Sequence, residues 1–339
     1  MNRKRKTPYK RTASKKRPSG QKGNHSLLKT VLVVVAAFFL GLLVERYDLP
    51  FDGLEARWDQ IVHSIRQWSN TVDFDPSEEE YVVDIRVFDV GQGSSMLLKG
   101  YDGTTILIDT GRFDDSEKRI ITYLNDEIGV GGKIDLLIFT HNDADHIGNG
   151  ELVLEYFQVG EVWMNGMDHT SQTYTRVLDA LLASNVTYVE AKRGETYTKG
   201  AFTIDVLHPQ QDATESNQND ESIATRLSIG DTQFIQTGDI DASIEAEIAH
   251  ERPYAVSADI MMIGHHGSRY SAGMEWIEAV DPAVAFYQAG QDNSYGHPHQ
   301  EVLDRLEALD IPVYGTDTFG TLSLTILPDG EWELKTEEE

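Results

Sequence analysis

Four side chains that can bind metal ions lie within six consecutive positions near the middle of the chain: His141, Asp143, Asp145 and His146. Imidazole and carboxylate groups together suit zinc, manganese or iron. Two histidines and two aspartates are more than one ordinary ion pair needs, so the cluster indicates two metal ions. Asp and His are also frequent in turns, which leaves a turn without metal as the alternative reading of this segment alone.

An apolar run over residues 134–139, broken only by Asp135, leads directly into this cluster. Such a run is typical of a buried strand. The cluster is therefore predicted on the loop after a strand, where regular backbone does not force alternate side chains apart.

Further acids and imidazoles follow other apolar runs, each with glycine nearby. Asp109 follows residues 106–108, Asp239 follows 234–238, and His265 with His266 follows 260–264. Taken singly, each could be a turn residue or a helix N-cap. Ligand sites of α/β sheets form at one end of the strands, so these positions together predict one shared polar site.

The motif HNDADH at 141–146 resembles the metal motif of the metallo-β-lactamase superfamily, in the variant with Asp in place of the second His. Five more segments resemble, in the same order, the soluble domain of ComEC-type competence proteins: FDVGQGS at 88–94, LIDTG at 107–111, TGD at 237–239, HHGS at 265–268 and NSYGHP at 293–298. The resemblance covers about residues 81 to 327. It implies a four-layer αββα sandwich and a metal-dependent hydrolase.

The resemblance also implies roles for individual residues. It implies six ligands for two divalent ions, Zn or Mn: His141 and Asp143 at one site, Asp145, His146 and His266 at the other, and Asp239 between them. Asp109 is expected behind the ligands, orienting an imidazole. His265 and His297 are expected to contact the substrate or act as acids, so the predicted catalytic residues are Asp145, His265 and His297. Asn293, in the same motif as His297, is predicted to bind substrate, and His265 and His266 could exchange roles.

One departure concerns the first metal site. The wider superfamily has a further histidine ligand between the central motif and the bridging aspartate. His169 and His208 are the candidates there, and neither is predicted to be a ligand. The first site is therefore expected to bind its ion more weakly. The exchange of His for Asp also favours manganese or zinc, and phosphoester rather than lactam chemistry.

Composition limits the alternatives. The chain has 339 residues, is 40% hydrophobic and contains no cysteine, so any metal must be bound by His, Asp and Glu. Of the 29 Lys and Arg residues, 11 lie in residues 1–44, which hold no acid; this leaves 18 bases against 56 acids, a net charge of −38, in the rest. So acidic a surface repels polyanions at long range and argues against a protein that coats nucleic acid. It does not exclude an enzyme whose bound metals invert the local field.

Four regions are predicted along the chain. Residues 1–26 form a basic, disordered cytoplasmic tail. Residues 27–45 form one transmembrane anchor, because the apolar run can span a bilayer and its basic flank stays inside; a cleavable signal peptide is the alternative. Residues 46–79 form an amphipathic stalk and an acidic linker. Residues 80–339 form the hydrolase domain, outside the cell membrane.

Within this domain, apolar periodicity and turn signals predict strands interleaved with helices and hairpins. Strands are predicted at 82–90, 94–98, 104–108, 134–139, near 162, and at 186–190, 202–207, 222–228, 232–236, 259–263, 283–287, 313–314 and 321–326. Helices are predicted at 114–127, 150–157, 171–183, 241–250 and 299–309. This pattern favours a layered α/β sandwich with mixed sheets.

The sequence thus predicts a membrane-anchored, outward-facing hydrolase with two metal ions that activate water for attack on phosphorus. A phosphodiester is the expected substrate, with DNA as a candidate, and a separate channel protein is a candidate partner. Two alternatives remain: a hydrolase of esters, lactones or lactams, and a membrane-anchored scaffold with a structural metal site.

Overall fold

Two β-sheets lie face to face at the centre of the fold. The computed structural model describes residues 81–210 and 217–337. One sheet contains β1 (Val83–Val87), β2 (Met96–Gly100), β3 (Thr105–Ile108), β4 (Lys133–Ile138), β5 (Gln158–Met164), β6 (Thr187–Glu190), β14 (Leu322–Ile326) and β15 (Trp332–Thr336). The other contains β7 (Thr196–Lys199), β8 (Phe202–His208), β9 (Ala224–Ile229), β10 (Thr232–Gln236), β11 (Ile260–Met262), β12 (Val284–Tyr287) and β13 (Val313–Gly315). The strand orders are β15-β14-β1-β2-β3-β4-β5-β6 and β13-β12-β11-β10-β9-β8-β7.

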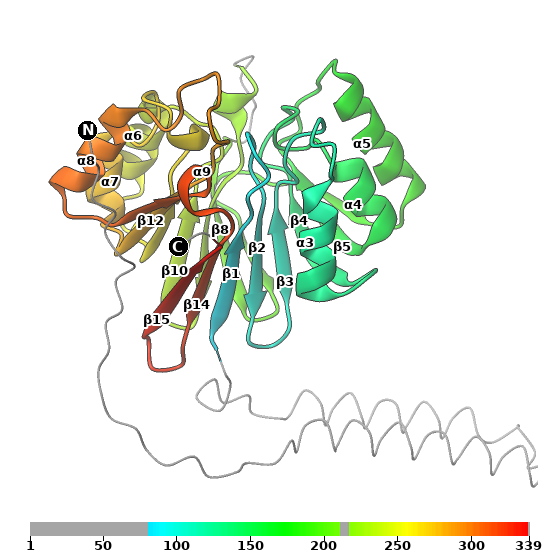
Figure 1. Cartoon of the computed structure of the whole chain (residues 1–339), viewed down its shortest axis with the longest axis horizontal. Coiled ribbons are helices and arrows are strands. Elements are labelled where there is room, and N and C mark those ends of the chain that lie inside the picture. Colours follow the sequence, from blue (N-terminus) through cyan, green and yellow to red (C-terminus); the bar gives the residue numbers. More distant parts are fainter. Residues whose placement is uncertain (1–80, 211–216, 338–339) are drawn as a thin grey trace, which may run out of the picture. The chain divides into compact units, whose positions relative to one another are not determined.

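Helices cover the outer face of each sheet. Those of the first sheet are α3 (Arg119–Ile128), α4 (Gly150–Tyr156) and α5 (Gln172–Ala183), and those of the second are α6 (Ala242–Glu251), α7 (Met274–Val280) and α8 (Gln300–Ala308). The two sets lie on opposite sides of the paired sheets, so the layers are helix, sheet, sheet and helix (Figure 1). The predicted α/β sandwich with mixed sheets is confirmed.

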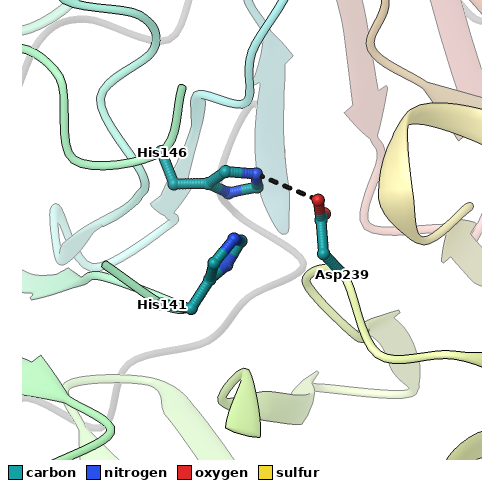
Figure 2. A group of neighbouring side chains, drawn as sticks. All are labelled: His141, His146 and Asp239. Carbon is teal, nitrogen blue, oxygen red and sulfur yellow. Dashed lines mark ion pairs between the residues drawn. The ribbon is translucent and has the colours of Figure 1, made fainter. Parts of the chain in front are cut away.

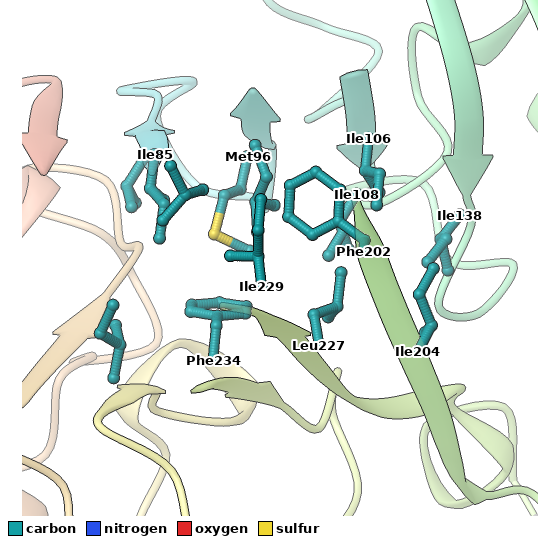
Figure 3. Packing of buried hydrophobic residues seen from close by; sticks show 14 of the residues in the cluster. Ile85, Met96, Ile106, Ile108, Ile138, Phe202, Ile204, Leu227, Ile229 and Phe234 are labelled. Carbon is teal, nitrogen blue, oxygen red and sulfur yellow. The ribbon is translucent and has the colours of Figure 1, made fainter. Parts of the chain in front are cut away.

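The alternation of side chains along the strands builds the inner core. Ile85, Met96 and Ile106 of the first sheet face Phe202 and Phe234 of the second (Figure 3). Successive strand residues point to opposite faces, so every second residue enters this layer. Burying each such side chain contributes roughly 2 to 3 kcal/mol.

The central strands are buried on both faces. Leu97 and Leu107 point outward into a second core beneath α3, α4 and α5. Ile235 and Met261 point into a third core beneath α6, α7 and α8. This is why these strands appear in the sequence as unbroken apolar runs.

Parallel pairing decides where the polar strand ends meet. Strands β3 to β6 are mutually parallel in the first sheet, and β10 to β13 in the second. Their carboxyl ends therefore lie along one edge of each sheet, and the acids and imidazoles that follow them are carried to those edges.

Some elements were not predicted. Strands β7 and β15 and helix α7 lie where the sequence pattern predicts no element. Both strands are edge strands of polar composition, so they lack the apolar signal. The predicted tail, membrane anchor, stalk and linker lie outside the described residues. Within the described part, no helix is both long and apolar enough to cross a membrane.

Candidate metal centre

The polar residues predicted at the strand ends come together between the two sheets' loops. Asp109 directly follows β3, and residues 139–149 connect β4 to α4. Asp239 lies between β10 and α6, the pair His265 and His266 follows β11, and residues 288–298 follow β12. The centre is thus built from both halves of the sandwich.

Three buried imidazoles direct their Nε2 atoms into this region. His141, His146 and His266 are at most 4% exposed. The Nε2 atoms of all three have no hydrogen-bond partner among the described residues. A buried polar atom without a partner is costly, and three in one place are rare in folded proteins. Their convergence fits a metal ion as the missing partner.

Carboxylates complete the donor set. Asp239 Oδ2 lies 3.4 Å from His146 Nε2 and 3.6 Å from His266 Nε2 (the former pair is drawn in Figure 2). Asp145 Oδ2 lies 3.4 Å from His266 Nε2. Two groups of ligand atoms result, both compact enough for an ion: His141, His146 and Asp239, and Asp145, His146 and His266.

The two groups share His146. A neutral imidazole offers one lone pair at Nε2, so His146 can bind one ion at a time. A second ion therefore depends on groups other than His146. Asp143 is one such group, since its Oδ2 lies 3.8 Å from His141 Nε2.

The opposite nitrogens are held by hydrogen bonds that select the tautomer. His146 Nδ1 lies 2.8 Å from Asp109 Oδ2, and His266 Nδ1 lies 3.0 Å from the carbonyl oxygen of Gln288. Both partners accept, so each Nδ1 donates, and in the neutral ring the Nε2 lone pair faces the centre. The structure places Asp109 where the sequence analysis expects it. Gln288 was missed, because a backbone carbonyl acts here and leaves no residue-type signal.

Burial and neighbouring charges shift the pKa values of these residues in opposite directions. Burial alone would lower the pKa of His146, but Asp239 and Asp109 raise it well above its usual value. Burial would likewise lower the pKa of His266, yet Asp239 and Asp145 raise it. Conversely, burial would raise the pKa of Asp239, but His146 and His266 hold it well below the usual range. Asp239 is therefore ionised, as a metal ligand must be, whereas His146 would release its Nε2 proton on binding an ion.

His141 occupies a different electrostatic position. Its Nδ1 lies 3.2 Å from Thr140 Oγ1 and 3.3 Å from Ser222 Oγ. Burial, together with the neighbouring His146, lowers the pKa of His141 to about 3. His141 is therefore neutral at physiological pH, with its lone pair available for a cation.

Of the two histidines considered for an additional ligand, one reaches the centre. His169 Nε2 lies 3.7 Å from Asp143 Oδ1. Its Nδ1 accepts a hydrogen bond from the backbone N–H of Ser171 (3.1 Å), which places the proton of a neutral ring on Nε2. His169 therefore faces Asp143 as a donor. His208 Nε2 instead contacts the carbonyl oxygen of Asp220 at 2.7 Å, outside both ligand groups.

His265 and His266 adopt left-handed backbone conformations in succession, with φ of 49° and 55°. Such angles are unusual outside glycine and are typical of functional sites. They turn His266 inward and leave His265 at the edge, 27% exposed, with Nε2 3.7 Å from Asp239 Oδ2. The structure therefore groups His266, not His265, with the buried ligands.

The loop after β12 lies against the centre. The ring of His297 stacks on that of His266 at a centroid distance of 6.1 Å. Burial, with His266 nearby, lowers the pKa of His297 to about 4. The amide of Asn293 bonds within its own loop, donating to the carbonyl of His297 (2.6 Å) and accepting from the N–H groups of Tyr295 and His297. Asn293 thus shapes the loop that presents His297, and its contact with substrate remains a prediction.

Comparison with known proteins agrees with this arrangement. A family model described as the metallo-β-lactamase superfamily matches residues 88–284. The chain is 32% identical over 255 residues to ComE operon protein 3 of Bacillus subtilis (strain 168), covering 70% of this chain and 32% of that protein. It is 26% identical over 241 residues to Competence protein ComA of Neisseria gonorrhoeae, covering 70% and 31%.

The chain therefore spans about a third of the length of the curated relatives it matches. Among solved structures, the metallo-β-lactamase fold protein YhfI from Bacillus subtilis matches with a TM-score of 0.46 and 13% identity, over 70% of this chain and 98% of that one. The family model covers more than half of the chain, including the loop at residues 139–149 (the ligand loop), Asp239 and His266. The chain therefore belongs to the metallo-β-lactamase superfamily.

Proposed function

We propose that this chain is a metal-dependent phosphodiesterase, with a nucleic acid such as DNA as its polymeric substrate. One observation carries the proposal: three buried Nε2 atoms without hydrogen-bond partners among the described residues converge with the carboxylates of Asp145 and Asp239. A scaffold has no need for open ligand atoms at several strand ends.

The residues present fit divalent ions of the manganese or zinc type. We infer that Asp145, His146, His266 and Asp239 would hold the tighter ion. The remaining pair, His141 and Asp143, would hold a weaker one. When bound, such ions supply Lewis acidity that activates water and neutralises anionic charge.

The chain's own residues position the reactants. Asp109 and the Gln288 carbonyl fix two imidazole rings, so the ligand geometry is set before substrate arrives. His265 stands at the edge of the centre, where its imidazole can donate to a phosphoryl oxygen. His297 lies on the same side, with its ring centroid 5.7 Å from that of His265 and 6.1 Å from that of His266.

We choose a phosphodiester as the substrate because of the types of the candidate ligands and the names of the related proteins. Three aspartates beside the three histidines make the donor set harder than an all-imidazole one, which suits phosphoryl oxygens bound through manganese or zinc. The relative ComA is named a competence protein. We carry this over as support for DNA as the substrate, and for a separate channel protein as partner.

The experiment is elemental analysis of the purified chain, together with hydrolysis of bis-(p-nitrophenyl) phosphate in added manganese. We expect two metal ions per chain, and turnover that falls at least a thousandfold in Asp145→Ala. Metal without turnover of this ester, of nucleic acid or of choline-type esters would sink the proposal. Turnover of carboxylic esters instead would establish the alternative hydrolase.

We also propose that residues 27–45 anchor the chain in the cell membrane, with the catalytic domain outside. The support is the apolar run at 31–44, interrupted by Gly41, with eleven Lys and Arg residues before it and Glu45 and Arg46 directly after it. Protease added to intact spheroplasts should remove a C-terminal epitope tag. A tag that is protected until the cells are lysed would refute this orientation.

A further inference from the structure

An arginine lies beside the loop that carries Asp145. Arg112 lies three residues after Asp109. Its backbone is packed between the turn at Gly93 and the loop that contains Asn149. Its carbonyl accepts a hydrogen bond from the side chain of Asn149 (3.0 Å), and its N–H lies beside Gly93, where an added Cβ would approach it to 3.2 Å. That same Cβ would lie 2.5 Å from the carbonyl oxygen of Asp145. The main chain of Arg112 is therefore fixed next to the main chain of a predicted ligand.

An exposed tyrosine approaches from the other sheet. Tyr295 lies on the loop after β12, is 56% exposed, and stacks on His297 at a centroid distance of 5.8 Å. His297 in turn stacks on His266. A row of three rings therefore runs from the buried ligands to the surface, and the outermost ring is a tyrosine.

Electrostatic interactions connect the two side chains. Burial alone would lower the pKa of Arg112, but the side chain of Tyr295 and the carboxylates of Asp114 and Asp145 raise it. The Nε–H of Arg112 pairs with Asp114 at 2.8 Å, and the side chains of both residues are substantially exposed. A guanidinium carries five N–H donors in a planar fork, so its terminal nitrogens can also bind an anion.

We propose that Arg112 and Tyr295 form a substrate-binding rim for single-stranded nucleic acid, in which the guanidinium binds a phosphate next to the scissile one and the tyrosine ring stacks on a base. The proposal rests on the phosphodiesterase function proposed above and names the part of the substrate that the metals do not touch.

The chemistry of the rim favours this occupant. The chain as a whole is acidic, with a net charge of −27. A cationic side chain beside the ligand loop is therefore a local site where an anion can bind. An arginine paired with an exposed aromatic ring is the combination that binds the phosphate and the base of an unpaired strand. Bases stacked within a duplex would not present a free face to Tyr295.

The test is a binding measurement that needs no turnover. Fluorescein-labelled hexathymidylate is titrated with the chain in calcium instead of manganese, and anisotropy gives Kd at several salt concentrations. We expect Arg112→Ala to raise Kd about tenfold and to reduce the slope of log Kd against log salt by about 0.7, the value for one lost phosphate contact. Arg112→Lys should keep the slope.

The tyrosine variants separate stacking from charge. Tyr295→Ala should raise Kd about tenfold with an unchanged salt slope, and Tyr295→Phe should bind much as the parent does. Arg176→Ala is the matched control, because Arg176 also pairs through Nε with one carboxylate, that of Glu151 at 3.0 Å, but lies on α5. It should leave both Kd and slope unchanged.

The outcomes test the substrate-binding rim separately from the proposed phosphodiesterase activity. Binding that depends on Arg112, in a chain that cleaves no phosphodiester in manganese, would support the rim and refute the proposed function. Cleavage of the oligonucleotide with unchanged KM in Arg112→Ala would refute the rim and leave the function standing. Equal Kd and slope in Arg112→Ala and Arg176→Ala, or no binding by the parent chain, would also overturn the rim.

Discussion

At the scale of a single residue, Asp109 controls how the buried candidate ligands are oriented. Its carboxylate accepts hydrogen bonds from Thr140 N, Thr140 Oγ1 and His146 Nδ1, each at 2.8 Å. It also adopts a left-handed conformation with φ of 58°. One side chain thus fixes both the start of the ligand loop and the tautomer of the histidine shared by the two ligand groups.

The first prediction concerns Asp109→Asn. The amide can no longer accept through both atoms, so His146 loses its fixed tautomer, and metal affinity should fall 10- to 100-fold. Isothermal titration with zinc measures this. Asp102→Asn is the matched control, since Asp102 also accepts from the N–H and hydroxyl of one threonine, Thr104, but within a hairpin turn. Equal affinity in the two variants would contradict the role given to Asp109.

The second prediction concerns Glu245, buried on α6. One carboxylate oxygen accepts from Gly273 N at 3.1 Å, and the other has no hydrogen-bond partner within the described part of the chain. Burial raises the pKa of Glu245 to about 7, with Asp241 adding to the shift and Arg305 opposing it. The folded state therefore holds a proton that the unfolded state, with its usual value of 4.5, releases.

It follows that this contribution to stability is complete below about pH 4.5 and is lost as pH rises through 7. Glu245→Gln mimics the protonated form and should match the parent at low pH but exceed it by roughly 3 kcal/mol at pH 8. Urea unfolding at pH 5 and pH 8 gives the difference. Glu247→Gln, an exposed neighbour on the same helix, should show no such growth with pH. Parallel pH profiles for all three proteins would rule out a buried protonated carboxyl.

At the scale of elements, the turn between β1 and β2 supports the ligand loop. Ser94 N donates to the carbonyl oxygen of Asp145 at 3.0 Å. Gly93, with φ of 154°, lies so close that an added Cβ would be 2.5 Å from that oxygen. Only glycine permits this approach, because an atom pair at that distance must move apart.

The third prediction follows from this contact. Gly93→Ala should push Asp145 outward, reduce metal affinity at least tenfold and lower the free energy of unfolding by about 1 to 3 kcal/mol. Gly103→Ala is the control: it shares a left-handed φ, 82°, but no described atom lies within 4 Å of its added Cβ. It should cost about 1 kcal/mol of backbone strain and leave metal affinity intact. Similar metal affinities in both variants would show that the turn does not hold Asp145.

The elements that the sequence predicts are those with a strong local signal. The strand at 232–236 is found as β10, and the helix at 171–183 as α5, because apolar periodicity and an N-cap serine mark them. The edge strand β15 alternates polar and partly buried residues and has no such mark. Strand order, and the parallel pairing that gathers the ligand positions, follow from contacts distant in sequence and could not be derived from local pattern.

The same distinction applies within the centre. Asp109, Asp239 and His266 could be identified because each follows an apolar strand and stands beside glycine. The approach of His169 to Asp143 and the Gln288 carbonyl to His266 depends on loops that carry no comparable pattern. Arg112 escaped notice for a related reason, since a single arginine in an acidic chain looks like an ordinary surface residue until its neighbours are known.

At the scale of the whole molecule, the candidate metal centre draws its residues from both sheets. His141, Asp145 and His146 come from the loop after β4 of the first sheet, whereas Asp239 and His266 follow β10 and β11 of the second. An ion bound by both sets would therefore connect the two halves of the sandwich. Unfolding either half would release it.

The fourth prediction tests that connection by metal removal. An ion that binds only the folded state stabilises it by about 2.7 kcal/mol at 100 times its Kd, which raises Tm by about 5 °C or more in a domain of this size. Calorimetry of the chain in manganese and after chelation should show this shift. His266→Ala removes a ligand from the second sheet and should abolish most of the shift, whereas His250→Ala, an exposed histidine on α6, should retain it. Equal Tm with and without metal would mean that the ligands of the two sheets are not joined by an ion.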